Sequence, residues 1–171
     1  MRRTLVTIFM AASLALAACA VPPTPYQPLI EAGRYGYSEE QIDAETWRVL
    51  FAGNRKTDRW QVEDYVLYRS AEIAAAAKAD GFVVLKEELE RDIAYYGVIH
   101  HPYGGFYFGR AYPYQAYLGV GATNLTPSKS YTGHLRIRLF QQPAPKGLGP
   151  AYDARGVIKV LGPKIVRPEP G

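Results

Sequence analysis

Three consecutive stretches decide the fold of this chain: TWRVLFAGN at 46–54, DRWQVEDYVLYRSAEIAAAAKAD at 58–80 and GFVVLK at 81–86. Apolar residues alternate with their neighbours in the first stretch, which predicts a strand over residues 46–52. In the second stretch apolar residues recur at helical spacing, which predicts a helix with one face buried. The third stretch is a short apolar run and predicts a buried strand over residues 82–86. A strand, a helix and a second strand therefore form the expected core.

The predicted helix has a signal at each end. Asp58 is of the residue type that caps helices, and Gln61 three residues later completes a capping box. The helix is expected to run to about Asp80, where Gly81 supplies a common stop. Its core-facing stripe is expected to consist of Val62, Val66, Ile73 and Ala77.

Weaker signals complete the expected fold. Alternation predicts a strand over residues 133–141, whereas residues 152–161 suit either a short helix capped by Asp153 or a strand. Ser38 with Gln41 suggests a helical turn. Residues 95–121 hold seven tyrosines, six glycines and no acidic residue, and predict a long loop or an irregular pair of hairpins. The sequence thus predicts an α+β fold: one long helix packed on a small sheet of three or four strands, with a long Gly/Tyr-rich loop.

The N-terminus carries an export signal. A basic start, Met1-Arg2-Arg3, precedes a mainly apolar run that is too short for a membrane span and ends in small residues before Cys19. Residues 20–28 contain four prolines and predict an extended tether, about 28 Å long at ~3.1 Å per residue. The expected organisation is a signal peptide at 1–18, a lipidated cysteine and tether at 19–35, one domain at 36–165 and a tail at 166–171.

The export signal resembles that of bacterial lipoproteins. The residues Leu16-Ala17-Ala18-Cys19 look like a lipobox, in which the cysteine becomes the first residue and carries fatty chains. The blocks at 36–39, 51–54, 62–72 and 152–163 resemble a family of small proteobacterial lipoproteins of uncharacterised function. This resemblance implies a lipid bilayer as partner through acylated Cys19, with a palmitate-type modification. The residue after Cys19 is Ala rather than Asp, which by analogy indicates the outer membrane, facing the periplasm.

Charge divides the chain into two halves. Residues 31–92 hold 9 basic and 14 acidic groups, whereas residues 93–171 hold 9 basic and 2 acidic groups. The two halves either face each other in one fold or present a basic surface to phosphates or an acidic wall polymer. An exported chain does not meet nucleic acid in the cytoplasm. With one cysteine in the chain, no intrachain disulfide can form.

Two sets of residues are candidate binding groups. Arg69 falls on the apolar face of the predicted helix, where it either grips an anionic ligand or acts as a structural anchor bonded to backbone carbonyls or to Glu72, with Tyr65 against its guanidinium. The tyrosines of the Gly/Tyr-rich segment either stack on sugar rings or pack on their own domain. The candidates in that segment are Tyr103, Tyr107, Tyr112 and Tyr114.

No reaction can be assembled from the residues. His100, His101 and His134 invite a metal hypothesis, but no acidic residue stands between Asp92 and Asp153 to orient an imidazole. We therefore expect no enzyme, no cofactor and no metal site. The leading expectation is a lipid-anchored envelope lipoprotein with a structural or protein-interaction role. The alternative is a binding module for cell-wall glycan (peptidoglycan) or an anionic envelope ligand, through the aromatic segment and the basic C-terminal half.

Overall fold

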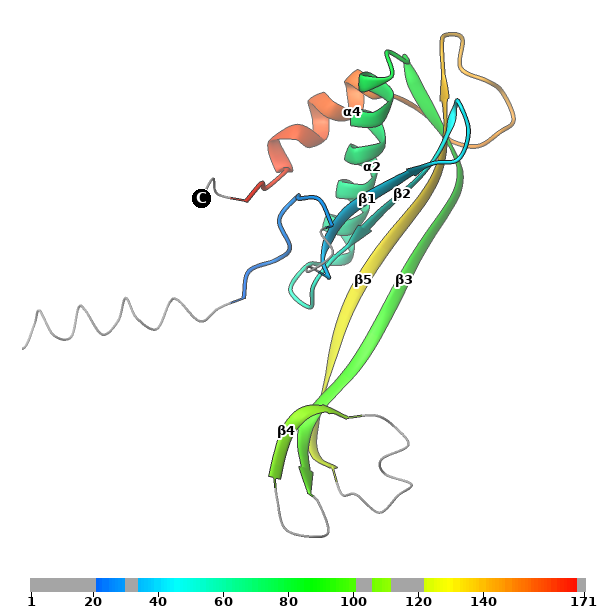
Figure 1. The fold of residues 1–171 in the computed structure, drawn as a ribbon. Coiled ribbons are helices and arrows are strands. Elements are labelled where there is room, and N and C mark those ends of the chain that lie inside the picture. The colour runs from blue at the N-terminus through cyan, green and yellow to red at the C-terminus, as the bar shows by residue number, and fades with distance from the viewer. Residues whose placement is uncertain (1–20, 30–33, 101–105, 112–121, 169–171) are drawn as a thin grey trace, which may run out of the picture.

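The computed structural model describes residues 21–29, 34–100, 106–111 and 122–168. Two helices lie on one face of an antiparallel sheet, and two of its strands continue far beyond the helices (Figure 1). The elements in chain order are β1 (Gly36–Gln41), β2 (Thr46–Ala52), α2 (Arg59–Ala76), β3 (Gly81–His100), β4 (Phe106–Ala111), β5 (Ala122–Phe140), β6 (Ala151–Asp153), α4 (Ala154–Leu161) and a 3-10 turn (Gly162–Lys164).

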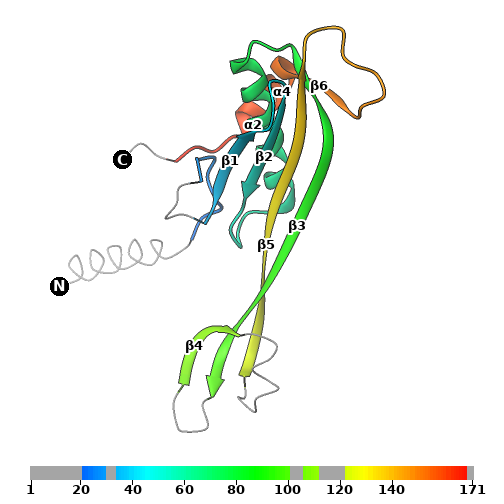
Figure 2. The ribbon, with the colours of Figure 1, turned by 45° about the vertical axis from the view of Figure 1, so that its right-hand side comes forward.

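The sheet has the strand order β1-β2-β5-β3-β4, and the short β6 pairs with the start of β3. All of these pairings are antiparallel. Strand β2 pairs with β5 only as far as Thr132, whereas β3 and β5 pair from Gly81 with Phe140 to Ile99 with Ala122. Beyond Thr132 the two long strands leave the body together as an arm (the described residues 91–100, 106–111 and 122–131), which β4 widens at its far end (Figure 2).

The predicted fold class is wrong in its proportions. The fold is dominated by the sheet, with helices of only 18 and 8 residues, instead of one long helix on a sheet of three or four strands. The strand expected at 82–86 continues to His100, and the strand expected at 133–141 begins at Ala122. Residues 86–92 are mostly charged, yet they belong to β3 because they pair with β5. Pairing with a neighbouring strand stabilises the extended conformation even where neither face is buried.

Of the two alternatives for residues 95–121, the described part agrees with a hairpin and contradicts the long loop. Residues 95–100 belong to β3 and residues 106–111 form β4, which pairs with it from Tyr95 with Ala111 to His100 with Phe106. Tyrosine and phenylalanine suit a pleated sheet, so the aromatic composition supports strands here. Residues 101–105 and 112–121 lie outside the described residues.

Helix α2 begins as predicted and ends early. The Asp58 carboxylate accepts a hydrogen bond from the Gln61 backbone N–H at 2.7 Å, which satisfies a free amide of the first turn. At the other end Lys78 adopts a φ of 58°, and the N–H groups of Lys78 and Ala79 bond back to the carbonyls of Ala75 and Ala74. This Schellman-type end stops the helix before the predicted Asp80.

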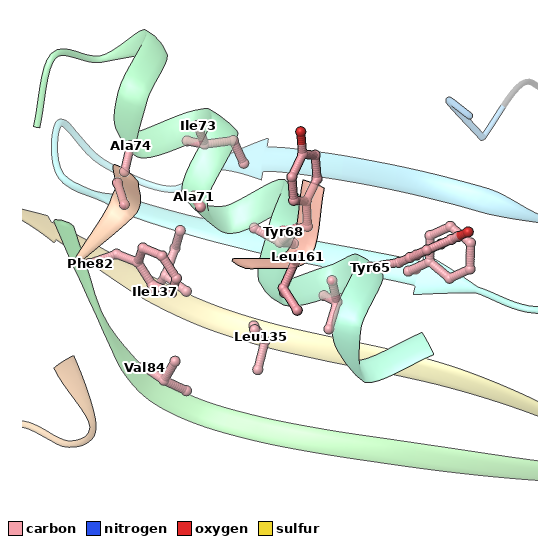
Figure 3. Packing of buried hydrophobic residues seen from close by; sticks show 14 of the residues in the cluster. Tyr65, Tyr68, Ala71, Ile73, Ala74, Phe82, Val84, Leu135, Ile137 and Leu161 are labelled. Atoms are coloured by element: carbon pink, nitrogen blue, oxygen red, sulfur yellow. The ribbon is translucent and has the colours of Figure 1, made fainter. Parts of the chain in front are cut away.

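The core lies between α2, α4 and the sheet (Figure 3). Side chains of α2 point toward Leu135 and Ile137 on β5 and Phe82 on β3, and Leu161 of α4 lies among them (Figure 3). Gly133 gives the helix close access to the sheet, because a Cβ there would lie 3.0 Å from a Val62 methyl carbon. The fully buried members with the largest side chains include Tyr65, Phe51, Phe82, Ile137, Val49 and Val62.

Of two local predictions, the structure confirms one and contradicts the other. Residues 154–161 form the helix α4 with the Asp153 side chain as its cap, so the helical alternative for this segment is confirmed. The helical turn expected at Ser38 is wrong, because residues 36–41 are the edge strand β1. Pairing of β1 with β2 determines its conformation, and the Arg48–Glu40 ion pair joins the two strands across that pairing.

Candidate functional site

The predicted site residues lie in different parts of the molecule. Arg69 is on α2, and Tyr107 is on β4, opposite Ile99 of β3. Cys19, Tyr103, Tyr112 and Tyr114 lie outside the described residues. The structure therefore describes one predicted site residue, Arg69, together with its contacts.

Arg69 lies between two carboxylates and an aromatic ring. Its guanidinium donates to both oxygens of Glu39 on β1, at 2.6 and 3.2 Å, and to Glu72 one turn along α2 at 2.8 Å. The ring of Tyr37 lies 4.4 Å from the guanidinium carbon, in the place expected for Tyr65. Burial opposes the positive charge, but the bonds to Glu39 and Glu72 outweigh it and raise the pKa of Arg69. These contacts favour the structural anchor over a grip on an anionic ligand.

Tyr26 extends this network to the N-terminal segment. Its ring is 4% exposed and lies against the rings of Tyr37, Tyr65 and Tyr68. Its hydroxyl donates to Glu72, and burial together with that bond raises the pKa of the Tyr26 hydroxyl. The segment that was expected to be a free tether therefore contributes a buried aromatic side chain to the domain.

A second set of bonds fixes the same segment to the loop between β2 and α2. Thr24 is 2% exposed, and its N–H donates to the Thr57 hydroxyl at 2.8 Å, while its own hydroxyl accepts from the Asn54 N–H at 2.8 Å. The Asn54 side-chain amide donates to the Pro22 carbonyl at 2.8 Å. The chain is thus held on the body from Pro22, three residues after Cys19.

Sequence reasoning found Arg69 and its local partner Glu72 but missed Glu39, Tyr26 and Thr24. Glu39 stands 30 residues before Arg69, and no local spacing relates the two. The sequence did contain a signal that the N-terminal segment packs on the domain. Thr24 and Tyr26 lie within the proline-rich stretch, and their hydroxyl groups and aromatic ring can make contacts that a spacer does not require.

The described residues were expected to hold no metal site, and they show no cluster of metal-ligating side chains. Among residues 21–29, 34–100, 106–111 and 122–168, no three His, Cys, Asp or Glu side chains are grouped so as to hold a metal ion. His134 lies on β5, with its Nε2 3.9 Å from Glu90. No helix in this described part of the chain has the length and apolar character needed to cross a membrane.

Comparisons with known proteins add no assignment. No protein-family model matches the chain, and neither a curated protein nor a solved structure is significantly similar to it.

Proposed function

We propose that the chain is a lipid-anchored protein of the bacterial envelope, with a structural or protein-binding role in which the arm makes the contact. The arm is the observation that carries this proposal. Strands β3 and β5 continue past the last residue paired with β2, into a part of the molecule that neither helix covers (Figures 1 and 2). A chain does not need such an extension to complete its own core.

The arm also offers surface for a partner. Within the described residues, neither 93–94 of β3 nor 122–130 of β5 pairs with a strand on its outer edge. A ribbon of two strands is marginally stable by itself in water, so contact with another surface would stabilise it. Tyr95 and Tyr96 are 39% and 43% exposed, and such aromatic side chains are enriched where proteins bind each other.

The anchor is supported by the sequence around Cys19 and by the docking of residues 22–26 on the body. A lipid at Cys19 would hold the domain near the bilayer, since the chain is fixed to the body three residues later. Labelling cells with a palmitate analogue tests this part: the native chain should be labelled, whereas Cys19→Ser should not. Unlabelled native protein would overturn the anchor.

Removal of the arm tests its role. Asp92 and Ser130 are register partners, so residues 93–129 can be replaced by an Asn-Gly turn that suits a two-residue hairpin. The shortened protein should fold and remain in the membrane, but chemical crosslinking in intact cells should no longer join it to its partner. An unchanged crosslinking pattern would refute the contact role of the arm.

A pair of point variants provides a matched control. Tyr95→Ser with Tyr96→Ser removes exposed aromatic surface from the arm, and Leu148→Ser with Val160→Ser removes exposed apolar surface from the body. Only the first pair should weaken the crosslink.

The exposure of Tyr95 and Tyr96 also favours a second candidate, binding to cell-wall glycan by stacking on sugar rings. Sedimentation with purified peptidoglycan distinguishes the two. Co-sedimentation that is lost in the Tyr95→Ser, Tyr96→Ser variant supports the glycan, and its absence with the native protein favours a protein partner.

A further inference from the structure

A basic cleft lies at the base of the arm. It has a volume of about 650 Å³ and opens between the loop that follows β2 and the outer part of β5. Three cationic side chains, one tyrosine and two aliphatic hydroxyl groups line it, and among the described residues no carboxylate does. The lining residues are Arg55, Lys56, Tyr96, Thr126, Pro127, Ser128 and Lys129.

Within the described residues, the three cations of the cleft form no ion pair, in contrast to several arginines elsewhere on the domain. Arg48, Arg59, Arg69, Arg138 and Arg167 each form an ion pair with a carboxylate. Within the part of the chain that the structure describes, Arg55, Lys56 and Lys129 form none. Like charges gathered around one cleft repel each other, and a bound anion relieves that repulsion.

The cleft lies next to the place where the chain would leave the membrane. Asn54 holds the Pro22 carbonyl and Thr57 holds the Thr24 amide, so the loop carrying Arg55 and Lys56 is fixed to the N-terminal segment. Three residues of extended chain span at most about 11 Å between Cys19 and Pro22. A lipid on Cys19 would therefore hold these cations at the depth of the headgroups.

An exposed tryptophan lies at the same end of the body. Trp60 stands in the first turn of α2, directly after the loop, and is 69% exposed. The Arg59 guanidinium carbon lies 5.2 Å from its ring. Tryptophan is enriched at membrane–water interfaces, where its ring lies among the headgroups. A large exposed ring beside a group of cations is therefore typical of a surface that meets a bilayer.

We propose that this end of the domain docks on anionic phospholipid headgroups, whose phosphates occupy the basic cleft while Trp60 enters the interface. The proposal rests on the lipid anchor proposed above and adds a second attachment to it. Arg55, Lys56 and Lys129 supply the charge, and the Thr126 and Ser128 hydroxyls can donate to phosphate oxygens. The anchor then determines the distance from the bilayer, and the cleft determines the orientation of the domain.

The charge contribution sets the size of the expected effect. Each basic residue near an anionic membrane surface favours the docked form by roughly fivefold. Loss of three should lower the ratio of docked to undocked protein on the order of 100-fold. Salt should weaken docking in the native protein, because the Debye length shortens to about 3 Å at 1 M ionic strength.

The test uses the native lipidated protein, reconstituted in vesicles that contain a lipid brominated near its headgroup. Quenching of Trp60 fluorescence should be stronger in vesicles of phosphatidylcholine with phosphatidylglycerol than in phosphatidylcholine alone. A Trp60→Phe variant gives the signal of Trp47, which is subtracted. The variant Arg55→Ala, Lys56→Ala, Lys129→Ala should lose the difference between the two compositions.

A matched variant controls for net charge. The variant Lys146→Ala, Arg155→Ala, Lys159→Ala removes an equal number of positive charges from exposed positions elsewhere on the body. It should keep the difference in quenching between the two vesicle compositions. Equal quenching in both vesicle types, or loss of the difference in both triple variants, would overturn the proposal. The proposal would also be overturned if the cleft bound inorganic phosphate but Trp60 quenching did not depend on vesicle composition. Flotation of the protein with neutral vesicles reports the lipid anchor separately, so its failure is distinguishable from failure of docking.

Discussion

Replacing Arg69 by alanine should destabilise the domain by about 2 kcal/mol, because two partly buried carboxylates would lose the cation they share. Glu39 and Glu72 accept three hydrogen bonds from this guanidinium. The Tyr37 ring covers the guanidinium and the Tyr26 hydroxyl is bonded to Glu72, so water can replace the lost donors only in part.

The magnitude follows from the exposure of the three side chains. Removing one partner of a fully buried pair costs about 3–5 kcal/mol, and an exposed pair contributes about 0–1 kcal/mol. Arg69, Glu39 and Glu72 are 22%, 27% and 24% exposed, between these limits. Arg167 remains 3.3 Å from Glu72 and offsets part of the loss, which places the estimate at about 2 kcal/mol.

Urea unfolding of the native protein and of Arg69→Ala measures the difference as a change in midpoint at constant slope. Arg48→Ala is the matched control: its pair with Glu40 is 47% and 64% exposed, so the change should cost no more than about 0.5 kcal/mol. A double-mutant cycle with Glu39→Gln should give a coupling of about 1 kcal/mol or more. If Arg69→Ala shifts the midpoint no more than Arg48→Ala, the anchor role of Arg69 is refuted.

Three further outcomes are expected. Tyr26→Phe should cost about 1–2 kcal/mol in urea unfolding, because the hydroxyl bond to Glu72 is lost, and an unchanged midpoint would contradict this role. Hydrogen bonds to the Asp43 carboxylate, of which the largest effect comes from the Glu45 N–H, lower its pKa in the folded protein. Its contribution to stability is therefore present above the ordinary aspartate pKa and is lost as the pH falls through the lower folded-state pKa. Asp43→Asn should therefore flatten part of the acid limb in a pH series of unfolding curves, and a limb of unchanged slope would argue against it. Gly81→Ala should lower stability by about 3 kcal/mol in thermal unfolding, since its Cβ would lie 2.2 Å from the Tyr152 carbonyl oxygen, and a native-like melting temperature would show that β6 can move at little cost.

The elements that sequence predicts well have a local cause. The strand at 46–52 follows from alternation, and the starts of α2 and α4 follow from the capping residues Asp58 and Asp153. The end of α2 does not, because Lys78 takes the left-handed conformation that a glycine was expected to provide. Nothing in the residue type of Lys78 indicates this in advance.

The arm was missed because its strands have little buried surface. A half-buried strand shows an apolar period of two, but residues 86–92, which lead from the body into the arm, carry charges on both faces. Their conformation depends on a partner about 40 residues away, such as Ser130 opposite Asp92. Similarly, the basic cleft joins residues 55–56 with residues 96 and 126–129, and only the sheet register brings these segments together.

The first and last described parts of the domain meet on α2. The Tyr26 N–H donates to the Val166 carbonyl at 2.7 Å, and Arg167 reaches Glu72 on the helix. Under the anchor proposed at Cys19, a reporter fused to the C-terminus would be attached beside the segment nearest the lipid rather than at the far side of the protein. Such a fusion would then sample the crowded layer next to the proposed bilayer, and a short linker there would restrict both the reporter and any neighbour that approaches the domain along it.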